Sequence, residues 1–251
     1  MKNKAEIRWM IVFLLIMISA CTPQVETETI SPESVETEVG VEIPTEEQSQ
    51  ETSTMTEEVI PTATPRTVLW QDDFSDVNSG WERYREVDGV LDYAEDEEVY
   101  QMQVNVENNL FWVMKDEDLV DVVLSVDAWQ VGGPEGSLYG LMCRYDPNAM
   151  NGYFFMISSQ GEAAVGIFDR GFQPIAGGEL TAFDVIATGL DAKNTITASC
   201  HGDSLTLSVN GEVIIDLPAA GLSGGDIGMA VASPAGAGVD VFFDDLVVYL
   251  P

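Results

Sequence analysis

The sequence predicts an all-β protein, built as a two-sheet antiparallel sandwich or jelly roll, and three observations support this fold class. Beyond residue 67, short runs of β-favouring residues are separated by Gly, Asn, Asp and Pro. No stretch carries a helical period, and helical turns are expected only as short pieces near Asp184 or Pro218. The segment from Asn194 to Leu217 has three such runs and two Gly-containing turns, which predict a three-stranded meander. Many strands with regular turn signals are typical of a sandwich.

The predicted strands follow one another along the chain with short connections. They span residues 68–74, 99–106, 110–114, 120–130, 138–145, 153–158, 163–168, 195–200, 205–209, 212–216, 227–232 and 239–250. The acidic run at 95–98 is interpreted as a turn.

Alternation within two of these strands predicts one buried and one solvent-facing side. In 205–209, Leu and Val alternate with Ser and Thr. In 120–130, the two sides consist of Val122, Leu124, Val126 and Ala128 and of Asp121, Ser125, Asp127 and Trp129. A two-layer sheet needs this division into an inner and an outer face.

Residues 1–20 have the features of the leader of an exported protein. Basic residues precede an apolar run at 9–18, and about ten apolar residues form a signal-peptide core that is too short to span a bilayer comfortably. Residues 18–21, Ile-Ser-Ala-Cys, resemble the lipobox of bacterial lipoproteins. This implies cleavage before Cys21, a diacylglycerol on its thiol, and a location on the extracellular face of the cell membrane. The alternative is an ordinary secreted protein in which Cys21 stands there by chance.

Residues 21–67 form a predicted linker between the anchor and the domain at 68–251. They are rich in Glu, Thr, Ser, Pro and Val and have no aromatic residue and no positive charge before Arg66. Such a segment cannot bury enough apolar surface to offset the entropy of ordering it, so we expect it to be disordered. It would reach on the order of 150 Å when extended and roughly 40 Å as a coil. Thr and Ser beside Pro at 61–65 also allow O-glycosylation, as an alternative to a plain solvated spacer.

The charge balance excludes one class of partner. Lys and Arg number 10 against 43 Asp and Glu, a formal net charge of -33. Phosphate backbones and anionic lipid surfaces are repelled by such a chain, so nucleic acid is not an expected partner and the membrane is contacted only through the lipid. Solubility outside a cell accounts for the acidity, and calcium coordination or attraction to cationic surfaces are the alternatives.

A set of short motifs runs through residues 68–251. They are Asp72-Asp73-Phe74, Gly80-Trp81, Tyr139-Gly140-Leu141 with Arg144, Tyr153-Phe154-Phe155-Met156-Ile157-Ser158 with Gly161, Asn194, Leu207-Ser208-Val209-Asn210-Gly211, Gly225-Asp226-Ile227-Gly228, and Val241-Phe242-Phe243-Asp244-Asp245-Leu246. Together they resemble the concanavalin A-like lectin and glucanase jelly roll, in its 3-keto-disaccharide hydrolase-like and laminin G-like branch. The resemblance implies two curved antiparallel sheets and a concave face that binds or cleaves glycans in relatives.

Two cysteines fall in this domain. An even pair in an exported domain usually forms a disulfide, and the resemblance implies that the strands of Cys143 and Cys200 are neighbours. Two buried free thiols are the alternative. A zinc site is not supported, because His201 is the single histidine and no CxxC spacing exists.

Acidic pairs stand in the first and last strands, which usually pair in a jelly roll. Alternation places Asp72 and Asp244 on otherwise apolar faces, where an unpaired charge is costly. A structural calcium ion held by these carboxylates would satisfy them. Backbone N–H groups or exposure at the sheet edge would also do so.

The sequence offers no catalytic residues. The Glu-x-Asp-x-x-Glu arrangement of glucanases is absent, and no Ser-His-Asp set, phosphate loop or nucleotide fingerprint can be assembled. Sugar binding is better supported, because an aromatic ring beside polar groups matches the apolar face and hydroxyl rim of a pyranose. The candidate ligand-binding residues are Trp129, Asp127, Arg144, Trp112 and Tyr153.

These observations predict a surface lipoprotein whose lectin-like sandwich binds a glycan or cell-surface polysaccharide without catalysis. The alternatives are a glycoside hydrolase or keto-sugar lyase of the 3-keto-disaccharide hydrolase type, and a structural, protein-binding envelope module.

Overall fold

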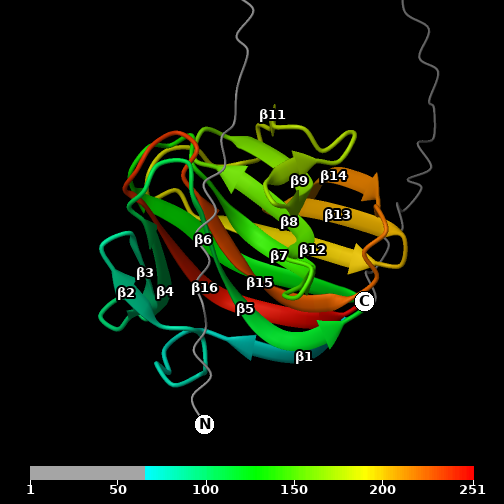
Figure 1. Ribbon diagram of the computed structural model, residues 1–251, viewed down its shortest axis with the longest axis horizontal. Coiled ribbons are helices and arrows are strands. Elements are labelled where there is room, and N and C mark those ends of the chain that lie inside the picture. The colour runs from blue at the N-terminus through cyan, green and yellow to red at the C-terminus, as the bar shows by residue number, and fades with distance from the viewer. Residues whose placement is uncertain (1–65) are drawn as a thin grey trace, which may run out of the picture. The chain divides into compact units, whose positions relative to one another are not determined.

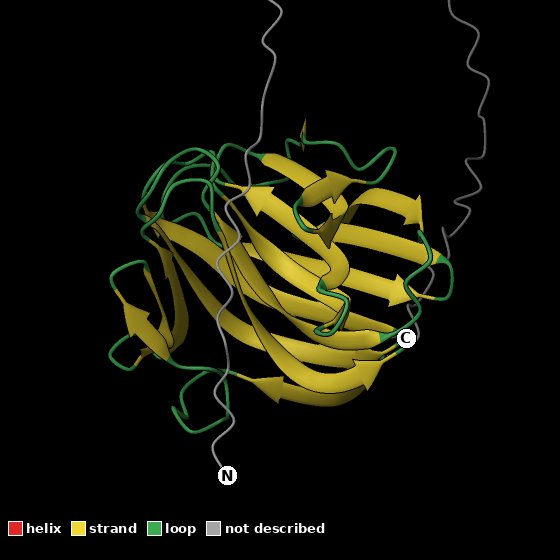
Figure 2. Cartoon of the chain, viewed as in Figure 1, coloured by secondary structure: helices red, strands yellow, loops and turns green. Residues whose placement is uncertain are grey.

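The computed structural model describes residues 66–251, which form strands and loops without a helix (Figures 1 and 2). The predicted leader at 1–20, the lipidation site Cys21 and nearly all of the predicted linker at 21–67 lie outside the described residues. The last residue of that linker, Thr67, already begins the first strand. The described strands pack into two antiparallel sheets, so the predicted sandwich is confirmed.

The larger sheet has nine strands. Its order is β14 (Glu212–Pro218), β13 (Ser204–Val209), β12 (Asn194–His201), β6 (Val122–Gly132), β16 (Val239–Leu250), β4 (Val99–Val104), β3 (Gly89–Ala94) and β2 (Tyr84–Glu86), with β1 (Thr67–Asp72) paired to β16. β6 follows one edge of β16, and β4 and β1 share the other edge.

The smaller sheet has seven strands. Its order is β10 (Phe172–Pro174), β9 (Glu162–Asp169), β8 (Asn151–Ser158), β7 (Leu138–Asp146), β15 (Gly225–Ala232) and β5 (Leu110–Leu119), with β11 (Thr181–Ala182) paired to β9.

The strand registers define two ends of the sandwich. Thr67 pairs with Leu250, so both termini of the described chain lie at one end, which we call the terminal end. The β12–β13 turn lies at the same end, because Cys200 pairs with Val122 at the start of β6. The opposite end, which we call the loop end, carries the β13–β14 turn and the β4–β5, β6–β7, β8–β9 and β15–β16 loops. Figure 2 shows many of these loops gathered opposite the C-terminus.

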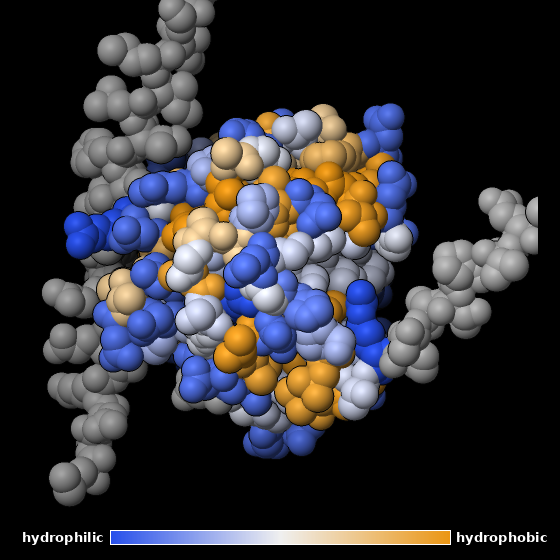
Figure 3. Space-filling view, turned by 90° about the vertical axis from the view of Figure 1, so that its right-hand side faces the viewer, coloured by the Kyte–Doolittle hydropathy of each residue, from blue (hydrophilic) through white to orange (hydrophobic). Residues whose placement is uncertain are grey.

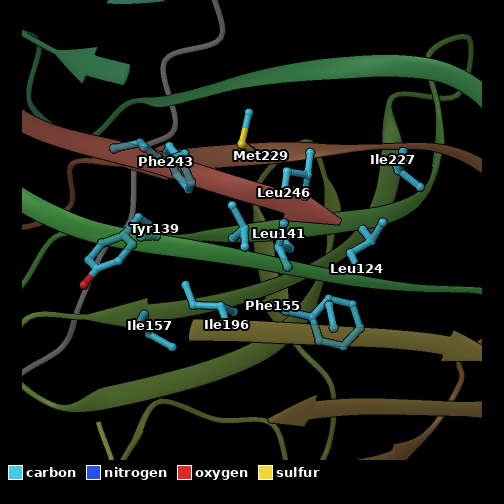
Figure 4. Packing of buried hydrophobic residues seen from close by; sticks show 14 of the residues in the cluster. Leu124, Tyr139, Leu141, Phe155, Ile157, Ile196, Ile227, Met229, Phe243 and Leu246 are labelled. Carbon is cyan, nitrogen blue, oxygen red and sulfur yellow. The ribbon is translucent and has the colours of Figure 1, made fainter. Parts of the chain in front are cut away.

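The main core lies between the two sheets. Phe243 of β16 and Leu124 of β6 face Leu141 of β7, Phe155 of β8 and Met229 of β15, all at most 1% exposed (Figure 4). Val122, Val126 and Ala128 are also buried, while Ser125, Asp127 and Trp129 of the same strand are partly exposed. The predicted faces of this strand are therefore confirmed. The surface outside is mixed, and Figure 3 shows apolar patches divided by hydrophilic residues on one side of the molecule.

All of the predicted strands are present, and the structure adds the short strands β2, β3, β10 and β11. Several strand boundaries differ by one or two residues, and two differences are informative. The first strand ends at Asp72, because Phe74 has a positive φ of 55° that an extended strand cannot accommodate. The strand predicted at 110–114 continues to Leu119 through charged residues that gave no β signal. Residues 95–98 form the expected turn.

Cys143 and Cys200 form a disulfide, as predicted. Their strands are not neighbours in one sheet, however, since β7 belongs to the seven-stranded sheet and β12 to the nine-stranded one. Both side chains are fully buried on the inner faces, so the disulfide joins the two layers through the core. The bond closes a loop with a sequence separation of 57 residues.

We predict that replacing both cysteines by alanine lowers the free energy of unfolding by about 4 kcal/mol, because the unfolded chain regains the entropy of this loop. Denaturant titration of the variant and the parent measures the change. Reduction of the parent with a thiol reagent should produce a similar loss. An equal midpoint in all three samples would contradict the prediction.

Candidate functional site

The structure distributes the predicted ligand-binding residues over three places. Trp129 and Asp127 lie on the outer face of the nine-stranded sheet, partly exposed. Trp112 lies on the outer face of the seven-stranded sheet, also partly exposed. Arg144 is 2% exposed and Tyr153 is fully buried. The five residues therefore do not form one site.

Trp129 is the centre of a cluster on the outer face of the nine-stranded sheet. The ring of Phe242, its register partner on β16, meets it edge to face at a centroid distance of 5.9 Å. Lys193 places its Nζ 4.2 Å from the centre of the Trp129 ring, a cation–π geometry. We call Trp129, Phe242, Lys193, Asp127 and Asp244 the Trp129 cluster.

Two carboxylates hold the lysine of this cluster in place. Asp127 and Asp244 are register partners on β6 and β16, and Lys193 Nζ lies 3.7 and 3.6 Å from their nearest oxygens. Thr195 donates a 2.6 Å hydrogen bond to Asp127. Burial and the neighbouring charge of Asp245 raise the pKa of Asp244, although Lys193 acts against them. The cluster therefore presents an aromatic face, a cation and two carboxylates together.

Polar contacts continue from the cluster across the sheet. Gln101 of β4 donates to both oxygens of Asp240, at 3.0 and 2.9 Å, and burial raises the pKa of this carboxyl. On β3, Asp92 accepts from Arg83 at 2.6 Å and from Arg85 at 3.0 Å. Burial acts to raise the pKa of Asp92, but these donors and the N–H of Tyr93 outweigh it and lower that pKa. The outer face of this sheet is thus polar, with Trp129 and Phe242 set into it.

The outer face of the seven-stranded sheet is different, because it holds a second apolar cluster. Trp112, Tyr145, Phe154 and Phe168 form a closed set of ring contacts with centroid distances of 5.7 to 6.5 Å, which we call the aromatic quartet. Trp112 and Phe168 stand on β5 and β9, with three strands between them. In a flat sheet these strands would be about 19 Å apart. The sheet therefore curls toward this face, and the concave side is filled by its own aromatic side chains.

Arg144 joins loops at the terminal end instead of facing a ligand. Its guanidinium donates to the carbonyls of Val120, Leu222 and Gly202 at 2.8 to 2.9 Å and contacts Asp121 at 3.2 Å. A bulge in β7 after Cys143 and a φ of 50° at Arg144 turn the side chain away from the sheet surface. The predicted role in ligand binding is therefore corrected to a structural one.

Tyr153 is also corrected to a structural role. Its ring lies in the main core, and its hydroxyl accepts a 3.0 Å hydrogen bond from the N–H of Leu222. A ligand from solvent cannot reach this side chain.

The two carboxylates predicted to share calcium have different partners. Asp72 accepts from the N–H of Phe74 and from the indole of Trp81, both at 2.9 Å, whereas Asp244 contacts Lys193. Asp72 is therefore satisfied by a backbone N–H group and an indole N–H group, without a metal ion. A small hollow of about 180 Å³ lies between β1 and β16, and it is lined by Asp72, Asp73 and Asp245 instead of Asp244. Within residues 66–251, no group of three or more His, Cys, Asp or Glu side chains has the arrangement of a metal site.

A larger hollow, of about 480 Å³, lies at the loop end between residues 182–185 and β14. Phe183, Val185 and Ile214 line it with Asp184 and Glu212. We call it the loop-end hollow. Sequence reasoning missed it, because a hollow between two distant segments has no local pattern.

Two asparagines fix the walls of the loop-end hollow. Asn194 is fully buried; its Oδ1 accepts from the N–H of Ala187 at 2.8 Å and from Asn210 Nδ2 at 2.9 Å. Asn210 Nδ2 also donates to the carbonyl of Val185 at 2.8 Å. The Asn210-Gly211 turn was predicted from the sequence, but its side-chain contacts were not. Because of these contacts, the turn and the 182–187 segment are held together.

No protein-family model matches the chain, and no curated protein matches it. Solved structures are similar in fold. A carbohydrate-binding module, CBM66, from Bacillus subtilis has a TM-score of 0.55 at 16% identity and covers 68% of this chain and 95% of its own. A protein of unknown function with a galectin-like fold from Bacillus subtilis has a TM-score of 0.53 at 14% identity, over 73% and 96%. An endo-acting O-glycanase of the human gut microbiota has a TM-score of 0.54 at 12% identity, over 73% and 99%.

These similarities establish the class of fold, a concanavalin A-like jelly-roll sandwich. Among the described residues, no helix is long and apolar enough to span a membrane.

We predict that Arg144→Met lowers the free energy of unfolding by about 3 kcal/mol, because three backbone carbonyls and Asp121 lose their charged donor. Arg170→Met, at an exposed arginine with only a 3.9 Å contact to Asp169, is the matched control and should have little effect. Thermal and denaturant unfolding measure both. Equal stability of the Arg144→Met variant and the parent would show that the contacts of Arg144 are dispensable for folding.

Proposed function

We propose that the protein is a surface-anchored lipoprotein whose β-sandwich binds carbohydrate without cleaving it. The observation that carries this proposal is the Trp129 cluster. Its partly exposed indole lies among a lysine and two carboxylates on the solvent-facing side of a rigid sheet. An aromatic ring supplies contact area for the C–H face of a sugar, and the charged groups supply hydrogen bonds to its hydroxyls.

The geometry indicates how a sugar would be engaged. Lys193 lies over the Trp129 ring, so a pyranose that stacks there displaces the ammonium toward the ring edge. Lys193 remains tied to Asp127 and Asp244, and its donors then point at the sugar hydroxyls. The half-exposed lysine, with 46% of its side chain accessible, has the freedom for this movement.

The fold similarities support a carbohydrate as the ligand. One similar structure is described as a carbohydrate-binding module and another as an endo-acting O-glycanase. The alternative of a glycoside hydrolase, or of a keto-sugar lyase of the 3-keto-disaccharide hydrolase type, requires two carboxylates flanking an open space for the scissile bond. Asp127 and Asp244 are register partners, but Lys193 occupies the space between them. Binding is therefore better supported than hydrolysis.

The anchoring part of the proposal depends on the sequence. Cys21 in its lipobox-like context would carry the lipid and hold the protein at the cell membrane on the extracellular face. Residues 22–65 would serve as the spacer. The spacer would enter the sandwich at Thr67, at the terminal end.

We predict that the full-length protein binds a subset of glycans on an array and releases no product. Trp129→Ala should weaken binding by about tenfold or more, since it removes the stacking surface. Trp129→Phe should retain part of the affinity, and Val87→Ala, at a 92% exposed residue in the β2–β3 turn, is a control that should behave as the parent. Released sugar would instead support the hydrolase alternative. Silence on every glycan would support the protein-binding alternative.

A second prediction concerns the anchor. Cells that express the parent and are fed radiolabelled palmitate should yield a labelled protein in the membrane fraction. Cys21→Ala should abolish the label and release the protein, because no acyl chain remains to hold it. Labelling that persists in Cys21→Ala would place the lipid elsewhere and refute this part of the proposal.

A further inference from the structure

We infer that the loop-end hollow is a second binding site, and that it takes an amino sugar through its free ammonium group. The inference rests on the proposed function only in taking the ligand to be a carbohydrate. The hollow is separate from the Trp129 cluster, and none of its lining residues belongs to that cluster.

The loop-end hollow has the size and the fixed walls of a ligand site. A volume of about 480 Å³ lies within the range of small-ligand clefts. Its walls come from two segments that are distant in sequence, 182–185 and the start of β14. They lie on the same side of the sandwich, near the labels β11 and β14 in Figure 1. The buried Asn194 and its neighbour Asn210 tie these segments together. The site is therefore preformed, and a ligand does not have to order it.

The lining of the loop-end hollow combines apolar and acidic side chains. Phe183, Val185 and Ile214 are partly buried and present an apolar wall, which suits the C–H face of a sugar ring. Asp184 and Glu212 are exposed at the same hollow, and within residues 66–251 neither carboxylate has a hydrogen-bond or ion-pair partner. These two carboxylates are hydrogen-bond acceptors beside an apolar wall. They therefore suit a ligand that has hydrogen-bond donors next to an apolar face.

The charge of the loop-end hollow is negative. No basic side chain lines the hollow, and the basic residues nearest in sequence, Arg170 and Lys193, pair with Asp169 and with Asp127 and Asp244. In a chain of net charge -33, an anionic sugar would be repelled from such a site. A protonated amine would be attracted and could hydrogen-bond to both carboxylates, which are charge-assisted contacts. An N-acetylated sugar of the same size lacks this charge.

The test compares two probes that differ only in acetylation. Full-length protein is titrated by calorimetry with a tetramer of glucosamine and with a tetramer of N-acetylglucosamine, at about 0.15 M ionic strength to screen non-specific attraction. We expect the glucosamine tetramer to bind and the acetylated tetramer to bind at least tenfold more weakly through this site.

Variants separate a site from general attraction to an acidic protein. The double variant Asp184→Asn/Glu212→Gln should lose about tenfold or more in affinity for the glucosamine tetramer. The control Asp203→Asn/Asp96→Asn removes the same charge at exposed turns that do not line the hollow and should bind as the parent does. Trp129→Ala should also leave this affinity unchanged.

The outcomes distinguish the two proposals. Equal losses in the two double variants would mean non-specific attraction and would overturn the inference, as would equal binding of both tetramers. If the array finds glycans whose binding depends on Trp129 while the glucosamine tetramer does not bind, the proposed function stands and this inference fails. If the glucosamine tetramer binds through Asp184 and Glu212 while no array glycan depends on Trp129, the hollow is a site and the Trp129 cluster is not.

Discussion

The seven-stranded sheet buries apolar side chains on both of its faces, and much of the structure depends on this. Its inner face packs on the nine-stranded sheet through Leu141, Phe155 and Met229, and its outer face packs on itself through the aromatic quartet. The curl that brings the quartet together needs close approach of the strands. A Cβ at Gly140 would collide with the carbonyl of Phe155, and one at Gly228 with the carbonyl of Val113. Only glycine permits this spacing.

The curl also determines which surfaces of the sandwich are open to solvent. In the family that the sequence resembles, the concave face binds or cleaves glycans. Here the concave face of the seven-stranded sheet is filled by Tyr145, Phe154 and Phe168, which are at most 5% exposed, together with the partly exposed Trp112. The polar outer face of the nine-stranded sheet and the loop end are the surfaces that remain open. Both surfaces carry carboxylates next to aromatic rings, which is the composition that a sugar requires.

The sequence predicted the fold well, because alternation and turn residues act locally. The strands of the meander and the two faces of β6 could be identified from residues two apart. The site residues could not be identified in the same way. Arg144 would lie on the outer face of β7 by alternation, but a bulge after Cys143 changes the phase and sends it toward loops that are distant in sequence. Tyr153 lies in a run that is apolar on both faces, where alternation carries no information.

The same limit applies to the partners of charged residues. Lys193 precedes β12 and gave no signal, yet it is the residue that joins Trp129, Asp127 and Asp244. Its position depends on the pairing of β6 with both β12 and β16, which brings three separate segments together. All three strands were correctly predicted as elements, but their order in the sheet is a property of the whole chain.

Acidic residues on the nine-stranded sheet respond to pH in opposite directions. Asp92 has a pKa below the usual 3.8, so its stabilising contribution is present above that value and is lost as the pH falls through the folded-state pKa. Asp240 and Asp244 have raised pKa values, so their contribution is present below 3.8 and is lost as the pH rises through their folded-state values. At neutral pH the charged carboxylates of Asp240 and Asp244 therefore lower the stability of the fold. Lys193 limits this cost at Asp244, and the Gln101 amide limits it at Asp240. A carboxylate that is kept charged at a cost to folding gains from any hydrogen-bond donor that reaches it, and this favours the recognition proposed at the face around Trp129.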